Sequence, residues 1–146
     1  NELKLKSDAD YEEAFREVLF EAVKCRLRAK GDIGIKLSGG LDSGSVASVA
    51  ATLLNEQNKR LNAYCAVPFS GYIDYLPKRL IADESPYVNA ICEKYSNIDI
   101  KYVQSENKNS ISEVDKLLNV YEQPYKTVEN AYWGNEISCI AAHDAF

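Results

Sequence analysis

The sequence predicts an α/β fold in which a parallel sheet carries helices on both faces. Segments with apolar residues at helical spacing alternate with short β-branched segments, and this alternation is typical of parallel strands joined by right-handed crossovers. A glycine turn connects the first strand segment directly to a helical one. Only three strand segments can be recognised, so we expect an incomplete sheet, as in a piece of a larger domain.

The first helix is expected over residues 11–29, because Ser7 and the acids after it suit a helix start. Its apolar stripe consists of Phe15, Val18, Leu19 and Ala22. Gly31 follows a basic helix end and is expected to stop the helix. Residues 33–37 are rich in β-branched and apolar side chains, which predicts the first strand. Lys36 is unusual there, because a buried charge needs a partner, and we expect it at the sheet edge rather than against substrate.

The second helix is expected to follow the glycine turn and to extend to about residue 58, because its apolar residues recur at helical spacing. Residues 61–69 predict the second strand, and Pro68 marks its exit because proline has no N–H to donate. Residues 70–81 are irregular and rich in aromatic side chains. A loop of this length in a compact domain is often functional.

Residues 83–86 are expected to open the third helix, with acids in its first turn and a proline inside its start. Residues 98–103 predict the third strand, and residues 111–120 predict a further amphipathic helix. Residues 121–125 interrupt that helix. A last helix is expected to begin near residues 128–132 and to continue to the end of the chain. The expected order is therefore α-β-α-β-α-β-α-α.

Residues 37–45 form the turn around which the chain is arranged, and they read L-S-G-G-L-D-S-G-S. A strand, a glycine turn and a helix together point backbone N–H groups and a helix N-terminus at an anion. Gly39 and Gly40 allow the backbone to turn tightly and to approach a ligand closely. Asp42 stands where a helix N-cap is expected, and its carboxylate also suits Mg²⁺. Hydroxyl donors for phosphate oxygens are available from Ser38, Ser43 and Ser45.

This turn differs from the two commonest phosphate-binding patterns. The Walker pattern requires a lysine after its second glycine, and the dinucleotide-binding pattern separates its glycines. The residues instead match S-G-G-x-D-S, the signature of N-type ATP pyrophosphatases, whose loop holds the β,γ-pyrophosphate of ATP. The alternative is an ordinary turn with a capping aspartate. The complete hexapeptide, placed between a strand and an amphipathic helix, favours the nucleotide-binding interpretation.

Composition limits the possible partners and locations. The formal net charge is −5 and no basic face is present, which argues against a general nucleic-acid binder. The four cysteines show no C-x-x-C pair and no metal-ligand spacing, so we expect reduced thiols and a cytoplasmic location. No apolar run approaches the ~18 residues of a membrane span, and no signal peptide leads the chain. Because the chain begins with Asn and ends within a helical pattern, we expect a fragment.

These segments together resemble the synthetase domain of glutamine-hydrolysing asparagine synthetases. That family combines an A-V-x-x-R-L helix end, a glycine-containing strand and the loop S-G-G-L-D-S, which residues 22–27, Gly34 and residues 37–43 match. Relatives such as GMP synthetase and NAD synthetase share the loop but usually lack the helix signature. Further segments in family-like order are 65–67, 83–87 and 122–124. The resemblance covers most of the chain, and the loop is its most specific part.

The resemblance implies a PP-loop ATP pyrophosphatase fold that binds ATP and Mg²⁺ at the loop. Leu37 and Val67 would flank the adenine, at the carboxyl ends of adjacent strands, where ligands bind in open α/β sheets. Asp42 would bind the Mg²⁺. The residues implied in nucleotide binding are Leu37, Ser38, Gly39, Gly40, Leu41, Asp42, Ser43 and Val67.

The resemblance also implies a reaction and its partners. In the family, the carboxylate of aspartate attacks the α-phosphorus of ATP, which gives β-aspartyl-AMP and pyrophosphate. Ammonia from a separate glutaminase domain then displaces AMP. Residues 1–146 would be the N-terminal part of the ATP-binding domain, and the main residues for the acceptor would lie beyond Phe146. The implied partners are ATP, aspartate or another carboxylate, and the glutaminase domain, without nucleic acid or membrane.

Two departures from the family pattern leave alternatives open. Gly44 stands where the family often has a second serine, and residues 122–124 read E-Q-P rather than the commoner D-E-P. A β-lactam- or lasso-peptide-forming relative would share every motif described above. A catalytically degenerate nucleotide-binding module is the alternative from another class, and its support is Gly44 together with Lys36.

Overall fold

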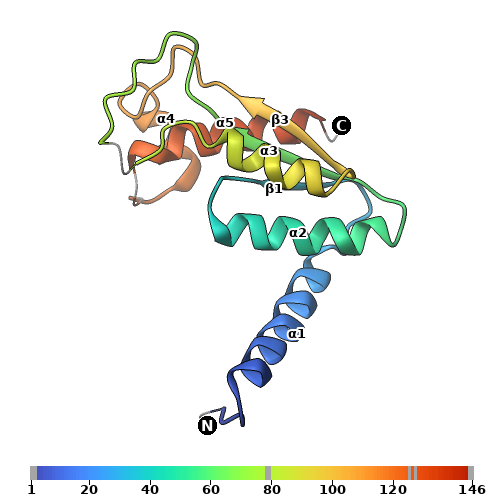
Figure 1. Cartoon of the computed structure of the whole chain (residues 1–146). Helices are drawn as coiled ribbons and strands as arrows, with labels where there is room; N and C mark the ends of the chain where they lie inside the picture. Colours follow the sequence, from blue (N-terminus) through green and yellow to red (C-terminus); the bar gives the residue numbers. More distant parts are fainter. Residues whose placement is uncertain (1–2, 78–79, 125, 127, 145–146) are drawn as a thin grey trace.

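The computed structural model describes residues 3–77, 80–124, 126 and 128–144. Helices and strands follow the expected order along the chain (Figure 1). The elements are α1 (Asp8–Arg26), β1 (Ile33–Lys36), α2 (Leu41–Asn55), β2 (Leu61–Ala66), α3 (Ser85–Lys94), β3 (Ile98–Val103), α4 (Val114–Tyr121) and α5 (Val128–Asp144). Among the described residues, no helix is both long enough and apolar enough to span a membrane.

The three strands form a parallel sheet in the order β1-β2-β3, as predicted. The register pairs Ile33 with Leu61, and Leu61 in turn with Ile98. β1 is therefore an edge strand of the described sheet. Our expectation that the chain is a piece of a larger domain stays a prediction.

Helices pack on both faces of this sheet, as the sequence predicts. Alternate residues of a strand point to opposite faces. Leu61, Ala63 and Cys65 of β2 join the larger core with residues of α2 and α3, such as Leu54 and Val88.

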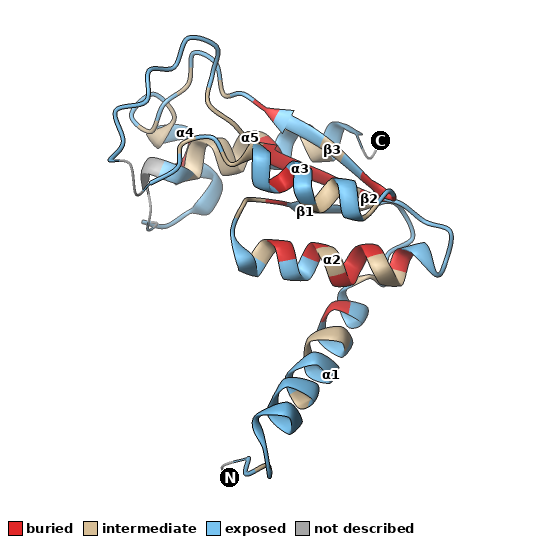
Figure 2. Cartoon of the chain, viewed as in Figure 1, coloured by how far each residue is buried: buried red, intermediate tan, exposed pale blue. Residues whose placement is uncertain are grey.

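Tyr64 of β2 points to the opposite face of the sheet and packs in a smaller core. The other members of that smaller core are Val103 of β3 and Ile137 of α5, with Trp133 packed against them. The buried residues in Figure 2 lie mainly along the sheet and along α2.

Helix α1 projects from the body of the chain (Figure 1). Ser7 caps it as expected, since its hydroxyl accepts a hydrogen bond from the Asp10 N–H over 3.3 Å. The predicted apolar stripe is only partly used: Leu19 packs against the core, whereas Phe15 and Val18 are each 68% exposed. The buried residue of the helix is Val23, which the predicted stripe did not include. The helix also ends at Arg26 rather than near residue 29. The Leu27 N–H bonds to the Lys24 carbonyl and closes the last turn early.

Several other predicted elements were too long, and local hydrogen bonds explain the difference for α2. α2 ends at Asn55 rather than near residue 58, because the Lys59 N–H returns to the Leu54 carbonyl and Asn58 adopts a positive φ of 55°. β1 ends at Lys36 and β2 at Ala66, one and three residues before the predicted ends, where the chain leaves the sheet.

α4 was predicted over residues 111–120 and begins only at Val114. The Asn109 side chain accepts hydrogen bonds from the N–H groups of Ile111 and Ser112, and this turn delays the helix. The predicted break after α4 is confirmed at Glu122, which has a left-handed φ of 55°. Tyr125 of that break and residues 145–146 of the predicted last helix lie outside the described residues.

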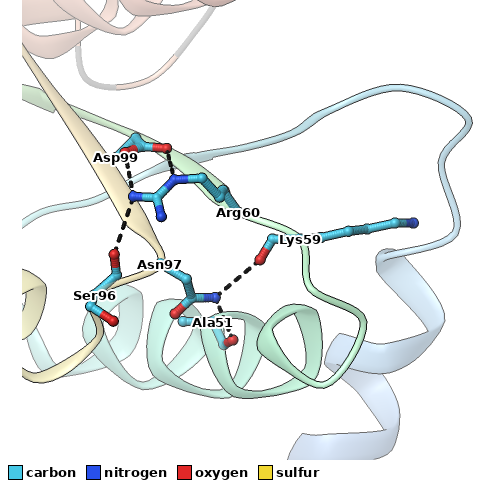
Figure 3. Close-up of polar contacts among 6 residues, drawn as sticks. All are labelled: Ala51, Lys59, Arg60, Ser96, Asn97 and Asp99. Atoms are coloured by element: carbon cyan, nitrogen blue, oxygen red, sulfur yellow. Dashed lines mark hydrogen bonds and ion pairs between the residues drawn. The ribbon is translucent and has the colours of Figure 1, made fainter.

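A cluster of polar side chains connects α2 to the sheet near the C-terminal end of α2, opposite the glycine turn (Figure 3). Asn97 is 8% exposed, and its amide donates to the carbonyls of Ala51 and Lys59 over 2.8 and 3.3 Å. Beside it, Arg60 donates to both carboxylate oxygens of Asp99. The hydrogen bond from Arg60 lowers the pKa of Asp99.

The substitution Asn97→Ala is expected to lower the free energy of unfolding by about 2 kcal/mol, because the buried Ala51 carbonyl and the partly buried Lys59 carbonyl would both lose a donor. Urea denaturation of the wild type and the variant measures this loss. Asp99→Asn serves as the control, since its ion pair with Arg60 is half exposed and screened by solvent, so its loss should cost less than the loss of the Asn97 amide. Equal losses in the two variants would contradict the assignment.

Candidate functional site

A cavity of about 530 Å³ lies where the three strands end. Leu37 and Ser38 follow β1, Val67 follows β2, and Val103 and Ser105 mark the exit from β3; all five line the cavity. Ligands of open α/β sheets bind beyond the carboxyl ends of the strands. The position of this cavity is therefore the one that the fold favours for a ligand.

The glycine turn is held together by its two serines. The hydroxyls of Ser38 and Ser43 lie 2.8 Å apart, and the Ser43 hydroxyl also accepts a hydrogen bond from the Ser38 N–H over 3.1 Å. Gly40 is the N-cap of α2 with φ −76° and ψ 152°, and no side chain caps the helix there. The first N–H groups of α2 are consequently available to an anion, and the helix dipole adds positive potential at this end.

Asp42 does not cap α2, contrary to the expectation from the sequence. It is the second residue of α2, and it is exposed. The difference arises because the chain becomes helical at Leu41, directly after the second glycine. An acid in this position still favours the helix dipole. Its carboxylate is free to face a ligand in front of the turn.

Glu84 is a partner of the turn that the sequence did not reveal. Its carboxylate accepts a hydrogen bond from the Gly39 N–H over 3.2 Å, although the two residues are 45 positions apart. A Cβ at Gly39 would lie 3.1 Å from the Cβ of Tyr87 and 3.2 Å from that of Glu84. The N-terminal end of α3 therefore packs directly on Gly39. The sequence marked Glu84 only as part of a helix start.

The position of Gly44 resolves one of the two departures from the family pattern. Gly44 is buried in α2, and a Cβ there would lie 3.1 Å from the Cδ1 of Ile91 on α3. A serine at this position would therefore point toward an apolar neighbour. A glycine at this position avoids that close contact between α2 and α3.

The predicted site residues surround the turn without sharing one cavity. Leu37, Ser38 and Val67 line the cavity at the strand ends. A second hollow of about 660 Å³ lies between α1, α2 and α3, and it is lined by Gly39, Gly40 and Leu41 among others. Neither lining includes Asp42 or Ser43. The turn thus separates two hollows.

Aromatic and apolar side chains form the outer wall of the first cavity. The segment between β2 and α3, which the sequence marked as irregular, contributes Phe69 and Tyr72, whose rings meet edge to face at 5.9 Å. Trp133 of α5 lies on the wall as well. Lys36 borders the cavity, and its ammonium donates to the Gly134 carbonyl of α5 over 2.7 Å. It belongs to the edge strand of the described sheet, as expected, but its place in the cavity lining leaves the expectation that it avoids substrate a prediction.

Cys65 lines this cavity and is 1% exposed. Burial, followed by the carboxylates of Glu84 and Asp83, raises the pKa of its thiol to about 11. Cys25 and Cys139 are exposed. We expect alkylation of the native protein near pH ~8 to modify these two thiols and to spare Cys65, because the thiolate is the reactive form. Peptide mass spectrometry measures the order of modification.

All four cysteines lie within the described residues and are free thiols. After denaturation without reductant, all four should therefore be alkylated. A pair that stays unmodified would show a disulfide and would contradict this arrangement.

The donor set at the turn limits how a metal could bind. In the described part of the chain, no three His, Cys, Asp or Glu side chains are grouped to hold a metal ion. Mg²⁺ commonly binds one or two carboxylates together with phosphate oxygens and water. Asp42, exposed beside the free N–H groups of α2, fits that arrangement as a single protein ligand.

Comparisons with known proteins agree with this geometry. Residues 14–133 match the family described as asparagine synthase. The chain is 32% identical over 110 residues to amidase chry2 of Gibberella zeae, which covers 74% of this chain and 16% of that protein. It is 45% identical over 69 residues to amidase chyE of Penicillium rubens, which covers 44% of this chain and 10% of that protein.

The chain thus spans about a sixth and a tenth of the length of these two relatives. The family match extends from α1 to α5 and includes the glycine turn, the sheet and the cavity at the strand ends. The parallel sheet with helices on both faces is the incomplete form of the PP-loop fold of this family. The chain belongs to the asparagine synthase family.

Proposed function

We propose that this chain forms the nucleotide-binding part of a ligase that activates a carboxylate with ATP and then converts it to an amide. The observation that carries the proposal is the glycine turn, which lies beside a cavity at the carboxyl ends of the strands. Aspartate is the substrate that we propose, with β-aspartyl-AMP as the intermediate. Residues 1–146 would then be the N-terminal part of the ATP-binding domain.

The residues of the site suit the parts of ATP in turn. Leu37 and Val67 border the cavity and would flank the adenine. The N–H groups of Gly39, Gly40 and Leu41 lie where α2 begins and would bind the pyrophosphate oxygens. The hydroxyls of Ser38 and Ser43 would add two donors.

The reaction requires charge stabilisation at the turn. A carboxylate oxygen attacks the α-phosphorus, the bond to the bridging oxygen breaks, and pyrophosphate leaves with the negative charge. Bound Mg²⁺ would supply positive charge to the leaving group. Asp42 would hold that ion, and the N–H groups of α2 would be oriented in advance toward the developing charge. Ammonia would then attack the activated carbonyl and release AMP.

Ammonia would come from a glutaminase domain. The four free thiols fit a reducing compartment such as the cytoplasm.

A substrate carboxylate other than aspartate is the second candidate. The two relatives are named amidases rather than asparagine synthetases, and that observation favours it. The aromatic wall formed by Phe69, Tyr72 and Trp133 also suits a substrate larger than aspartate.

A degenerate nucleotide-binding module receives less support from the structure. A Cβ at Gly44 would crowd the Ile91 side chain, and the Lys36 ammonium is bonded to the Gly134 carbonyl, so both residues that suggested lost activity also have neighbours within the fold.

Exchange of labelled pyrophosphate into ATP tests the proposal in the intact protein. Exchange that depends on aspartate and Mg²⁺ is the expected result. Exchange with other carboxylates but without aspartate would support the second candidate. ATP binding without exchange for any carboxylate would contradict carboxylate activation and favour the degenerate module.

A further inference from the structure

Glu84 binds the glycine turn through a group that a phosphate would also need. Its carboxylate holds the Gly39 N–H, which is one of the donors proposed above for pyrophosphate. The backbone of Glu84 is at the same time the N-cap of α3, where its carbonyl accepts from the Val88 N–H over 3.2 Å. The side chain therefore extends from a fixed helix end, and only its carboxylate needs to move to release Gly39.

The surroundings of Glu84 make sharing with a phosphate unfavourable. Its side chain borders the cavity at the strand ends. Gly39 lines the second hollow, so the basic residues of both linings matter. They are Lys36, Arg16 and Lys94, and each has another partner in the described structure: Lys36 donates to the Gly134 carbonyl, Arg16 pairs with Glu13, and Lys94 lies over the Tyr95 ring. A phosphate oxygen at Gly39 would therefore meet a Glu84 carboxylate that none of these three cations neutralises, and the two anions repel.

We propose that Glu84 is a positioning residue that competes with pyrophosphate for the Gly39 N–H, an inference that rests on the proposed function. Without a phosphate, the carboxylate accepts the hydrogen bond of this N–H and holds the N–H in a fixed direction. When a phosphate oxygen arrives, the carboxylate turns away. It returns as pyrophosphate leaves, so it weakens phosphate binding and speeds product release.

Titration calorimetry of inorganic pyrophosphate with the intact protein, in the presence of EDTA, tests this competition. Glu84→Gln retains an acceptor for the Gly39 N–H and removes the charge. We expect the variant to bind pyrophosphate at least ~5-fold more tightly, the factor that two unit charges a few ångströms apart produce even across water. Saturating Mg²⁺ should reduce the difference, because the ion neutralises the ligand.

Asp83→Asn is the matched control. Asp83 is the neighbouring acid, but its carboxylate accepts a hydrogen bond from the Ser85 N–H over 2.9 Å instead of from the turn. Its removal should change the affinity by less than about twofold, because an exposed charge is screened. An equal gain in both variants would mean that net charge alone acts, and it would overturn the inference.

Two further readouts separate competition from mere structural support. In the intact enzyme, Glu84→Gln should lower both KM for ATP and kcat, because tighter binding slows the release of pyrophosphate. The Gly39 amide resonance should shift when pyrophosphate is added. Weaker or unchanged pyrophosphate binding in Glu84→Gln would overturn the inference while leaving the proposed function intact. Absence of binding in both wild type and variant would contradict both.

Discussion

Asp42→Asn is expected to lower ATP–pyrophosphate exchange at least ~100-fold, because groups that stabilise charge in the transition state commonly contribute that much. Asp42 is exposed in the first turn of α2, beside N–H groups that attract phosphate. A bare carboxylate there would repel the same phosphate, so its presence is best explained by a Mg²⁺ ion between them. Exchange in the intact protein measures the effect.

The structure makes this substitution more selective than the sequence suggested. Gly40 is the N-cap of α2, so Asp42→Asn removes no cap and alters only the interaction with the helix dipole, about 0.3–1 kcal/mol. Asp115→Asn is the matched control, because Asp115 is an exposed acid in the first turn of α4. Both variants should melt within a few degrees of wild type. Exchange that stays within a few-fold of wild type in Asp42→Asn would show that the carboxylate binds no essential ion.

Gly39→Ala is expected to reduce exchange at least ~10-fold and to destabilise the protein by about 1–3 kcal/mol, as overpacking commonly does. The added Cβ would lie 3.1–3.2 Å from the Cβ atoms of Tyr87 and Glu84, which are fixed to the backbone of α3. Either the turn or α3 must then move by a few tenths of an ångström. Small displacements of the groups that position a substrate have large effects on rate.

Gly31→Ala is the control for this prediction, since no heavy atom lies within 4 Å of a Cβ placed there. Its exchange rate and melting temperature should match those of the wild type. Thermal unfolding and the exchange assay should be measured on the same samples. If Gly39→Ala behaved like Gly31→Ala, the close packing of α3 on the turn would be wrong.

The sequence alone determined the order of the elements, the parallel sheet and the place of the glycine turn. These features have local causes. Helical or strand periodicity shows within each segment, and alternation of the two allows few topologies. The resemblance to the asparagine synthetase family pointed to Leu37 and Val67 as neighbours of the adenine, and the structure brings both to one cavity.

The first and last residues of the helices were harder to predict from the sequence, because single hydrogen bonds determine them. The turn at Asn109 delays α4, and the early closure at Leu27 shortens α1. Asp42 illustrates the same difficulty. Its residue type suits an N-cap, yet the N-cap is Gly40, two residues earlier.

Only the tertiary structure decided which distant residues complete the site. Glu84 meets Gly39 across 45 residues of sequence, and Lys36 meets Gly134 across 98. Trp133 and neighbouring residues of α5 line the cavity together with the strand ends and the segments that follow them. Contacts of this kind depend on how α3 and α5 pack on the sheet, and such packing leaves no periodic signal in the residues themselves.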